Sequence, residues 1–392
     1  MHLLFSLIAS AIITGTPLPP WQEGCLDIHA INSGRGECTF FILPDGTTML
    51  VDAGEFVPSK GAKYKFVAQK PDSLTRPSEV YIRYIRHFMP AVCKGAIDYA
   101  LLTHYHIDHS GKQEAWMEPD PDRGYVLTGI SAVEAALPFR TLIDRAWPRY
   151  EESLVASSSK GIDFYPKFVK YACKHDGMKA GAFKVGSSRQ LRLRHRPCRY
   201  RNFHIKNYAA GGIVWDGRKK VNVYEGKTLR ENGASCCFLL SYGLFDYYSG
   251  GDAGGNSEVE VPVAHAIGRP IEALKSNHHL SYYTMKDETM KILQPQVMVT
   301  QGFTVRDIQP DYTIVGHLLH DDVYPGPKYY YFTNLDKEQL DAHPAEYNGI
   351  AGYDGHVVIR VMPGGKEFLV FLLEDTDFEY HIKSVDGPFT CK

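Results

Sequence analysis

The chain has almost no net charge. Its 43 Lys and Arg residues are matched by 45 Asp and Glu residues, which leaves a formal net charge of −2. A nearly neutral protein has no overall electrostatic field that attracts nucleic acid. Any site for a polyanion must therefore be a local patch of basic side chains.

Cysteine motifs are also missing. The eight cysteines form no Cys-x-x-Cys pair and no zinc-ribbon spacing. Most of them are expected to be small buried residues. One or two disulfides are the alternative if the chain is exported.

Long apolar runs are absent except at the N-terminus. Residues 1–21, "MHLLFSLIASAIITGTPLPPW", combine an apolar run with small residues and prolines, which predicts a signal peptide. No Lys or Arg precedes the run, so a hydrophobic first strand or helix is the alternative. The first interpretation predicts a secreted or periplasmic protein, and the second a cytoplasmic one. No other segment approaches eighteen apolar residues, so no membrane span is expected beyond the N-terminal segment.

What the chain does contain favours strands and turns. It has 25 Tyr, 19 Phe, 35 Gly and 23 Pro. Its length of 392 residues is enough for two average domains or one large α/β sandwich. Strands are expected at 25–32, 38–43, 48–54, 97–104, 189–201, 235–249, 297–303 and 356–375. Helices are expected at 76–93, 131–147 and 162–175.

These elements predict one domain over residues 22–392. Its strand-rich segments, 25–110 and 232–375, are expected to form two sheets packed on each other with helices outside. The segment 112–230 between them is interpreted as a helical and arginine-rich insertion.

The densest group of polar residues follows the strand expected at 97–104, in "LLTHYHIDHSG". His104 and His106 are two positions apart, so in a strand they lie on one face. After a bend, Asp108 and His109 can approach a second point nearby. Imidazole and carboxylate groups suit zinc, manganese or iron, and two adjacent metal ions can activate water. The alternative is a chance cluster of polar loop residues.

This stretch resembles the His-x-His-x-Asp-His signature of the metallo-β-lactamase superfamily. Three further pieces, "INSGRGECTFFILPDGTTMLVDAGE", "ENGASCCFLLSYG…YYSGGD" and "LKSNHHLS", occur in the order found in the hydrolase domain of the ComEC-type competence proteins and in bacterial phosphorylcholine esterase. The resemblance covers roughly 25–110 and 230–300. It implies a four-layer αββα sandwich and a stand-alone hydrolase, since the membrane channel segments of ComEC are absent.

The resemblance also implies how two divalent metal ions would be held, with zinc favoured and manganese or iron as alternatives. His104 and His106 would hold the first ion, and Asp108 and His109 the second. Asp252, in Gly-Gly-Asp, would bridge both ions. Asp108 and Asp252 would therefore be the catalytic carboxylates.

Further roles follow from the same resemblance. His279 or His278 would complete the second site, and His279 is preferred because it directly precedes Leu280 and a small residue. Relatives often carry Gly where this chain has Leu280. Asp52 would orient a ligand histidine by hydrogen bonding without touching the metal.

Two positions depart from the wider superfamily. Asn232 stands where many members place a third histidine for the first metal ion, and ComEC-type sequences carry Asn there as well. His175, His195 and His204 are candidates to compensate, although each is expected to be a surface or packing residue. Arg35 stands where ComEC-type sequences usually carry Gln, and it could contact an anionic group.

An arginine-rich stretch is the main indication of the substrate. Its members are Arg189, Arg192, Arg194, Arg196, Arg199 and Arg201, followed by Arg218, Lys219 and Lys220. Guanidinium groups suit phosphate, and the interleaved aromatic residues suit nucleic-acid bases. The alternative is a solvated strand face.

The sequence therefore predicts a metal-dependent hydrolase of phosphodiester bonds, with nucleic acid or a phosphorylated polymer as its anionic substrate. One alternative keeps the fold but hydrolyses another ester, a thioester, a lactone or a β-lactam. A second alternative is a metal-stabilised module that binds anionic polymers without catalysis.

Overall fold

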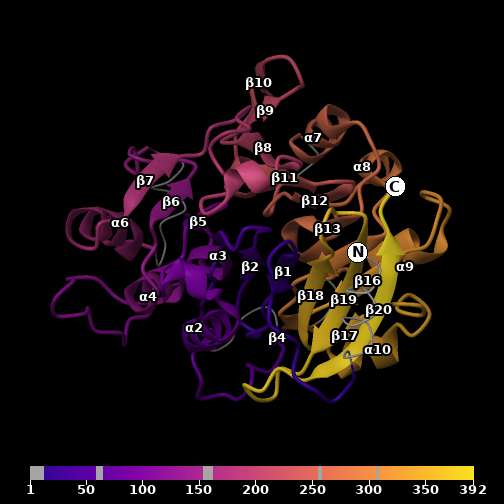
Figure 1. Ribbon diagram of the computed structural model, residues 1–392, viewed down its shortest axis with the longest axis horizontal. Coiled ribbons are helices and arrows are strands. Elements are labelled where there is room, and N and C mark those ends of the chain that lie inside the picture. The colour runs from indigo at the N-terminus through magenta and orange to yellow at the C-terminus, as the bar shows by residue number, and fades with distance from the viewer. Residues whose placement is uncertain (1–12, 59–64, 153–161, 255–257, 306–308) are drawn as a thin grey trace.

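The computed structural model describes residues 13–58, 65–152, 162–254, 258–305 and 309–392 (Figure 1). Residues 1–12 of the expected signal peptide lie outside the described residues, so export stays a prediction. The residues after them contact the body of the protein. Leu18 is buried, and Pro17 pairs with His381 in an isolated antiparallel β-bridge.

Nine strands of the described chain form the first sheet, in the order β20-β19-β18-β1-β2-β3-β5-β6-β7. Their bounds are β1 (Leu26–Ala30), β2 (Thr39–Ile42), β3 (Thr48–Val51), β5 (Tyr99–Leu101), β6 (Thr141–Asp144), β7 (Lys179–Ala182), β18 (His356–Val361), β19 (Glu367–Leu373) and β20 (Ile382–Thr390). Strands β3, β5, β6 and β7 are parallel, and the other neighbours are antiparallel.

Nine further strands of the described chain form the second sheet, in the order β10-β9-β8-β11-β12-β13-β14-β16-β17. Their bounds are β8 (Phe203–Ala210), β9 (Ile213–Trp215), β10 (Lys220–Asn222), β11 (Cys237–Tyr242), β12 (Phe245–Ser249), β13 (Ala273–Lys275), β14 (Val297–Thr300), β16 (Tyr329–Phe332) and β17 (Gly352–Tyr353). The strands from β12 to β17 in this order are parallel. A separate two-stranded ribbon pairs β4 (Lys65–Phe66) with β15 (Thr304–Val305).

Side chains that alternate along each strand divide the protein into layers. On β2, Phe41 lies in the core between the sheets, whereas Phe40 lies in the core on the outer side of the first sheet. On β11, Phe238 lies between the sheets and Leu239 lies on the outer side of the second sheet. Burial of apolar surface on both faces of both sheets is the main favourable contribution to folding.

Helices cover the two outer faces. Those on the first sheet are α2 (Pro77–Phe88), α4 (Gly129–Ala136) and α6 (Phe164–His175), and those on the second are α7 (Glu260–Ile267), α8 (Asp287–Leu293) and α9 (Tyr312–His320). Shorter helices lie in connections, namely η1 (Ala91–Cys93), α3 (Ile107–Ser110), η2 (Pro197–Arg199), η3 (Asn232–Ala234), η4 (Asn277–Leu280) and α10 (Lys337–Ala342). The expected four-layer αββα sandwich is confirmed.

The helix expected at 131–147 is wrong beyond its first half. Helix α4 ends at Ala136, because Pro138 follows and a proline ring cannot continue a helix. The chain then forms β6, which pairs in parallel with β5. The helix expected at 76–93 is confirmed as α2, which begins at Pro77 and ends before Pro90.

The strand expected at 189–201 is also wrong. Apart from η2, this stretch has no regular structure, because side chains rather than a neighbouring strand accept its backbone hydrogen bonds. The amide of Arg194 donates to Oγ1 of Thr47, and the amides of His195 and Arg196 donate to Oδ2 of Asp45. The segment is therefore held against the first sheet without joining it.

The division into two strand-rich halves needs one correction. The hairpin of β18 and β19 comes from the second half, yet β18 pairs with β1 and extends the first sheet. The segment 112–230 is part of the sandwich, because it contributes β6 and β7 to one sheet and β8, β9 and β10 to the other.

Two expectations about the whole chain can be compared with the structure. Within the described ranges, no helix has both the length and the apolar character needed to cross a bilayer. All eight cysteines lie in these ranges as free thiols, and Cys198 is exposed.

Candidate metal centre

Polar residues that follow four parallel strands meet at one edge of the sandwich. Asp52 follows β3, His104 follows β5, Asp252 follows β12, and the pair 278–279 follows β13. Parallel neighbours end at the same edge, which brings the first two together and the last two together. A hydrogen bond of 3.0 Å from the amide of Cys236 to the carbonyl of Thr103 joins the two sheets there.

His104, His106 and Asp252 form the first group of candidate ligands. Each offers one atom, and the three atoms lie within 4.8 Å of one another. Nε2 of His104 lies 3.1 Å from Nδ1 of His106 and 3.6 Å from Oδ2 of Asp252. His104 and Asp252 are fully buried, whereas His106 is partly exposed. The solvent-facing side of this group is therefore at His106.

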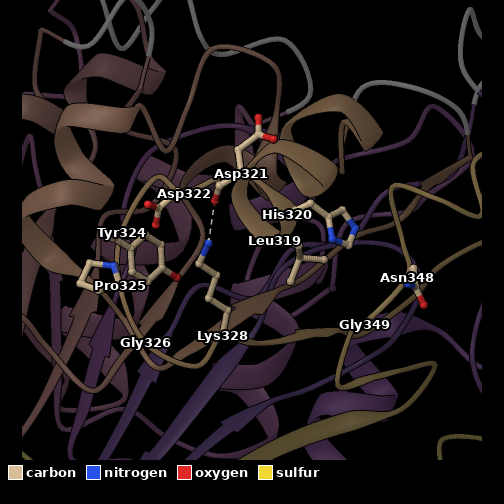
Figure 2. Close-up of a pocket in the computed structure, with 10 residues that line it drawn as sticks. All are labelled: Leu319, His320, Asp321, Asp322, Tyr324, Pro325, Gly326, Lys328, Asn348 and Gly349. Atoms are coloured by element: carbon tan, nitrogen blue, oxygen red, sulfur yellow. Dashed lines mark hydrogen bonds between the residues drawn. The ribbon is translucent and has the colours of Figure 1, made fainter.

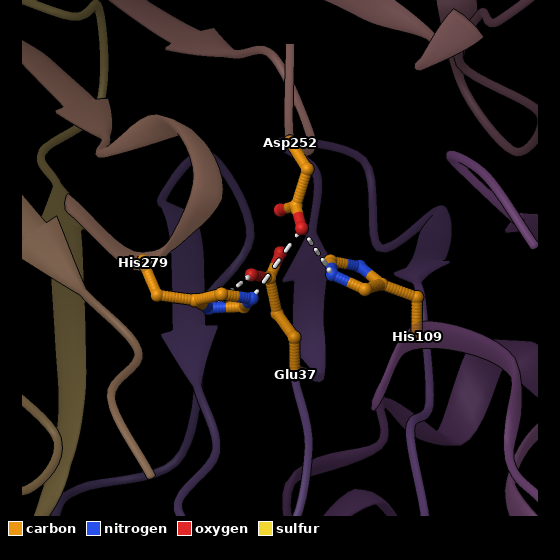
Figure 3. Close-up of side chains that lie close together, drawn as sticks. All are labelled: Glu37, His109, Asp252 and His279. Atoms are coloured by element: carbon orange, nitrogen blue, oxygen red, sulfur yellow. Dashed lines mark ion pairs between the residues drawn. The ribbon is translucent and has the colours of Figure 1, made fainter. Parts of the chain in front are cut away.

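His109, His279, Asp252 and Glu37 form the second group, which also meets the 4.8 Å criterion (Figure 3). Nε2 of His109 lies 3.2 Å from Oδ2 of Asp252, and Nε2 of His279 lies 3.5 Å from the same oxygen. Asp108 borders this group, with its Oδ2 3.4 Å from Nε2 of His279. Because Asp252 belongs to both groups, it can bridge two metal ions.

Several buried polar atoms of the cluster have no hydrogen-bond partner. They are Nε2 of His109, Nε2 of His279 and both carboxylate oxygens of Asp252 and of Glu37. Buried polar atoms in proteins are nearly always hydrogen-bonded, because an unpaired one costs about 1–3 kcal/mol. Unpaired imidazole nitrogens and carboxylate oxygens that converge on one point suit a divalent cation, so these residues fit a metal ion.

The electrostatics of the cluster lead to the same conclusion. Burial opposes the charged form of both histidines, but the Asp252 carboxylate and its neighbours raise the pKa of His109 well above its usual value and that of His279 to about 9. Burial also opposes ionisation of Asp252, yet these histidines hold its pKa well below its usual value. The site thus attracts positive charge, which a metal ion bound by these residues would supply in exchange for protons.

Asp52 makes the contact that the resemblance implied. Its Oδ2 lies 2.8 Å from Nδ1 of His109, while its two oxygens also accept from the amide and hydroxyl of Thr103, each at 2.7 Å. The bond to Nδ1 leaves Nε2 of His109 directed at Asp252. Asp52 therefore orients a ligand without belonging to either group.

The backbone of the histidine pair adopts an uncommon conformation. His278, His279 and Leu280 have φ angles of 43°, 52° and 60°, all in the left-handed region that favours glycine. A residue held there costs on the order of 1–3 kcal/mol, and such strain is concentrated at functional sites. The turn separates the two rings, since Nε2 of His279 points into the cluster and His278 lies at its rim.

His278 is a rim residue that contacts Asp252 only at 3.7 Å. Its Nε2 lies 3.2 Å from Nδ2 of Asn232 and 2.9 Å from Nε2 of Gln309. Burial lowers the pKa of His278 to about 4, which keeps the ring neutral. Asn232 therefore reaches the cluster through His278 and is in neither ligand group.

Glu37 and Lys275 belong to the site but were not predicted. Nζ of Lys275 lies 3.0 Å from Oε2 of Glu37 and 3.9 Å from Oδ1 of Asp252, and all three side chains are buried. Glu37 lies two residues before β2. Because β2 runs antiparallel to β3, it begins at the edge of the sheet where β3 ends. Strand direction was the signal that could have placed Glu37 in the site.

Arg35 is another predicted residue that lies outside both ligand groups. Its guanidinium donates to the carbonyls of Gly34 and Val67, so it holds the loop before β2. Burial lowers the pKa of Arg35.

Gly54 has a steric role at the site, because a Cβ there would lie 1.7 Å from the carbonyl oxygen of Asp108.

None of the three candidate compensating histidines reaches the cluster. His175 ends α6 and stacks on Tyr171, and His204 lies on β8. His195 joins Cys93 and Asp98 in a separate group whose ligand atoms also lie within 4.8 Å of one another. Oδ2 of Asp98 already accepts from the amide of Thr48 and contacts Nε2 of His195 at 3.1 Å. That group is therefore a satisfied structural contact.

Two hollows lie near the cluster, and His278 contacts one lining residue of each, Asn232 and Gln309. One, of about 360 Å³, is lined by Tyr224, Thr228, Arg230, Asn232, Gly233, Glu258, Tyr282 and Tyr283. The other, of about 260 Å³, is lined by Phe56, Val57, Pro58, Phe66, Ile107, Asp108, Lys112, Phe303, Thr304 and Gln309. We call them the polar hollow and the apolar hollow.

A further hollow of about 360 Å³ lies between the end of α9 and the start of β16 (Figure 2). Its only drawn hydrogen bond joins Nζ of Lys328 to the carbonyl of Asp321 at 3.0 Å. It contains no residue of either ligand group, so the chemistry of the cluster does not extend to it.

Fold and site together define an αββα sandwich whose strand ends hold two groups of side chains able to bind metal ions. No protein-family model matches the chain, and a search of curated proteins finds no match. The identification therefore stops at this class.

Similar folds occur among solved structures. Zinc-bound PqqB from Methylobacterium extorquens is 11% identical with a TM-score of 0.35, over 70% of this chain and 88% of PqqB. CmlA, a diiron β-hydroxylase from Streptomyces venezuelae, is 13% identical with a TM-score of 0.39, over 88% of this chain and 55% of CmlA. The short form of human tRNase Z is 10% identical with a TM-score of 0.32, over 70% of this chain and 91% of that protein. Scores this low carry no argument about chemistry.

Proposed function

We propose that this protein is a metal-dependent phosphodiesterase that uses two divalent metal ions, with zinc favoured over manganese or iron. The observation that carries the proposal is the placement of the two hollows, each of which has a lining residue in contact with His278. A phosphodiester has two alcohol substituents, and each would need space beside the metal ions. A monoester would need only one such space.

The motifs support the same proposal. The stretches that resemble the ComEC-type hydrolases supply His104, His106, Asp108 and His109, then Asp252, then His279, and these side chains lie together in space. Asn232 and His278, which touch each other, also come from those stretches.

The residues present define the roles in the reaction. His104 and His106 would hold one ion, His109, His279 and Asp108 would hold the other, and Asp252 would bridge. Bound metal ions would supply positive charge and lower the pKa of a water molecule. Nδ2 of Asn232 and the hydroxyl of Tyr283 are donors at the rim, where they could bind the phosphate oxygens of the substrate.

Charge favours an anionic substrate over a neutral thioester, lactone or β-lactam. Arg230 lines the polar hollow, and a guanidinium group binds phosphate oxygens in a bidentate manner. Lys275, with its Nζ 3.9 Å from Oδ1 of Asp252, partly offsets the negative charge of the carboxylates at the site.

The test starts with protein purified without chelator, whose metal content is measured. It is then assayed on bis-p-nitrophenyl phosphate, on p-nitrophenyl phosphate, and on thioester, lactone and β-lactam substrates. We expect diester hydrolysis that stops on chelation and returns with zinc or manganese.

Variants identify the site. Asp252→Asn should abolish turnover, while Asp341→Asn, a matched change on an exposed residue of α10, should leave it unchanged. Preference for the monoester, or turnover of neutral substrates alone, would contradict the proposal. Metal binding without turnover of any ester would instead favour a non-catalytic binding module.

A further inference from the structure

The arginine-rich stretch forms one wall of the largest hollow described so far. This hollow has a volume of about 740 Å³ and is lined by Tyr99, Thr141, Ile143, Ala180, Gly181, Lys184, Arg189, Gln190, Arg192, Leu193, Arg194 and Pro197. It lies beside β5, β6 and β7, at the outer edge of the first sheet. We call it the basic hollow.

The basic hollow has four cations and no acidic residue in its lining. Lys184, Arg189 and Arg192 are exposed, and none of them forms an ion pair with a described carboxylate. Arg194 lies over the ring of Tyr99 at 4.4 Å and donates to Oγ1 of Thr141. Several like charges around one concavity raise the local potential and attract an anion.

Other arginines of the same stretch are engaged differently. Arg196 and Arg199 each form an ion pair with Glu23, at 2.9 Å and 2.7 Å. Arg196 and Arg199 therefore tie the stretch to the N-terminal region, whereas Arg189, Arg192 and Arg194 line the basic hollow. Arg201 is exposed and belongs to neither set.

The basic hollow and the metal centre lie at opposite ends of β5. Tyr99 lines the hollow and begins this strand, and His104 follows its end. Five residues of extended chain span roughly 16 Å. A linear substrate several units long could therefore contact both places at once.

We propose that the basic hollow binds phosphate groups of a polyphosphodiester chain whose scissile bond lies at the metal centre. The inference rests on the proposed phosphodiesterase function and adds a second contact site for polymeric substrates. Guanidinium groups are planar donors that match phosphate oxygens, and the contact requires no particular base or sugar. The proposed role is therefore affinity for the polymer and not chemistry.

The experiment compares a polymer with a small substrate. The polymer is a thymidine oligonucleotide of about 20 nucleotides, a length that exceeds common single-strand site sizes. The small substrate is bis-p-nitrophenyl phosphate. The variant is Arg189→Glu combined with Arg192→Glu, and the matched control is Arg201→Glu, an exposed residue of the same stretch outside the basic hollow.

We expect the double variant to raise KM for the oligonucleotide about tenfold or more at low salt, with unchanged kinetics on the small substrate. The slope of log affinity against log salt should become less steep by about 1–2, since each lost phosphate contact on a single strand contributes about 0.7. Arg201→Glu should change neither quantity by more than about twofold.

Equal losses on both substrates, or no loss on the polymer, would overturn the inference. If the unmodified protein cleaves no phosphodiester, the proposed function fails, but oligonucleotide binding in the presence of chelator still tests the basic hollow. A second polymer, a poly(glycerol phosphate) chain without bases, identifies the source of the phosphates. Equal dependence on Arg189 and Arg192 shows that the phosphodiester backbone is recognised, whereas binding of neither polymer overturns the proposal.

Discussion

Lys275 and Glu37 form a buried ion pair directly beside the bridging carboxylate. Nζ of Lys275 lies 3.0 Å from Oε2 of Glu37, and it also donates to the carbonyl of Gly251 at 2.8 Å. Burial raises the pKa of Glu37, and its nearest cation, Lys275, acts in the opposite direction. The single positive charge of Lys275 therefore lies beside two buried carboxylates, those of Glu37 and Asp252.

Lys275→Met should destabilise the protein strongly, because it leaves the Glu37 carboxylate buried without a cation. Removal of one partner of a buried pair costs about 3–5 kcal/mol. Denaturation midpoints in urea would show the loss, and Lys275→Met combined with Glu37→Gln should recover most of it. Lys337→Met, which removes an exposed and solvent-screened pair with Asp341, should leave the denaturation midpoint nearly unchanged. Additive losses in the double variant would show that the two residues do not act as a pair.

Metal stoichiometry should separate the two ligand groups. Asp252 belongs to both groups. The carboxylate of Asp108 contacts His109 and His279, which are both members of the second group. We expect Asp252→Asn to lose both metal ions and Asp108→Asn to keep one. Native mass spectrometry after metal loading would measure this. Retention of two ions in Asp252→Asn would contradict the bridging role.

Asp52→Asn should weaken the second metal site without removing a ligand. Asp52 accepts from Nδ1 of His109 and so fixes the direction of Nε2. Loss of such an orienting carboxylate typically costs 10–100-fold in metal affinity. Titration with zinc should show weaker binding of one ion, with full occupancy and activity restored at high zinc concentration. Activity that stays lost at saturating zinc would mean that Asp52 does more than orient His109.

Removal of the metal ions should lower the thermal stability of the protein. The unpaired atoms of His109, His279 and Asp252 would then face one another without a cation. A ligand that binds only the folded state stabilises it by an amount that grows with the ratio of free ligand to Kd, about 2.7 kcal/mol at a hundredfold ratio. Differential scanning fluorimetry with and without chelator measures the shift in Tm. An unchanged Tm on complete metal removal would count against a buried metal centre.

Stability should also depend on pH through Glu134 on α4. Burial, together with Asp176, raises the pKa of Glu134 to about 7, although Arg123 opposes the shift. The folded state thus binds this proton more tightly than the unfolded state, whose pKa is near 4.5. Its contribution to stability is complete below about pH 4.5 and is lost as the pH rises to about 7.

A substitution isolates this effect. The unmodified protein should lose about 2–3 kcal/mol of unfolding free energy between about pH 4.5 and pH 7, since each unit of pKa shift corresponds to about 1.36 kcal/mol. Glu134→Gln should abolish this loss. Urea denaturation at pH 5 and pH 8 measures it. Glu79→Gln, a change at a partly exposed residue of α2, is the control and should leave the pH dependence as it was.

Local patterns predicted much of the fold and of the site. The spacing of His104 and His106 and the apolar residues before them are properties of a few neighbouring positions, and the structure keeps both in one ligand group. The strand-rich segments likewise predicted two packed sheets, and the structure places alternate side chains of β2 and β11 in different layers.

Errors arose where a local pattern competed with a contact distant in sequence. The apolar residues of 141–144 fit a helix as well as a strand, and pairing with β5 decided for the strand. In the arginine-rich stretch, Asp45 accepts the backbone donors that a neighbouring strand would otherwise bind. Neither the pairing with β5 nor the hydrogen bonds to Asp45 can be predicted from the neighbouring positions in the sequence.

The sequence by itself determined which chemical groups are available, namely histidines and carboxylates placed directly after buried strands. Its apolar patterns also indicated two packed sheets with helices outside. Only the tertiary structure decided which of those groups meet. Glu37 and Lys275 lie 238 positions apart, and they form an ion pair because an antiparallel and a parallel strand reach the same edge of the sandwich. The physical reason is that the side-chain period is local, whereas the direction and neighbours of each strand depend on how the whole core packs.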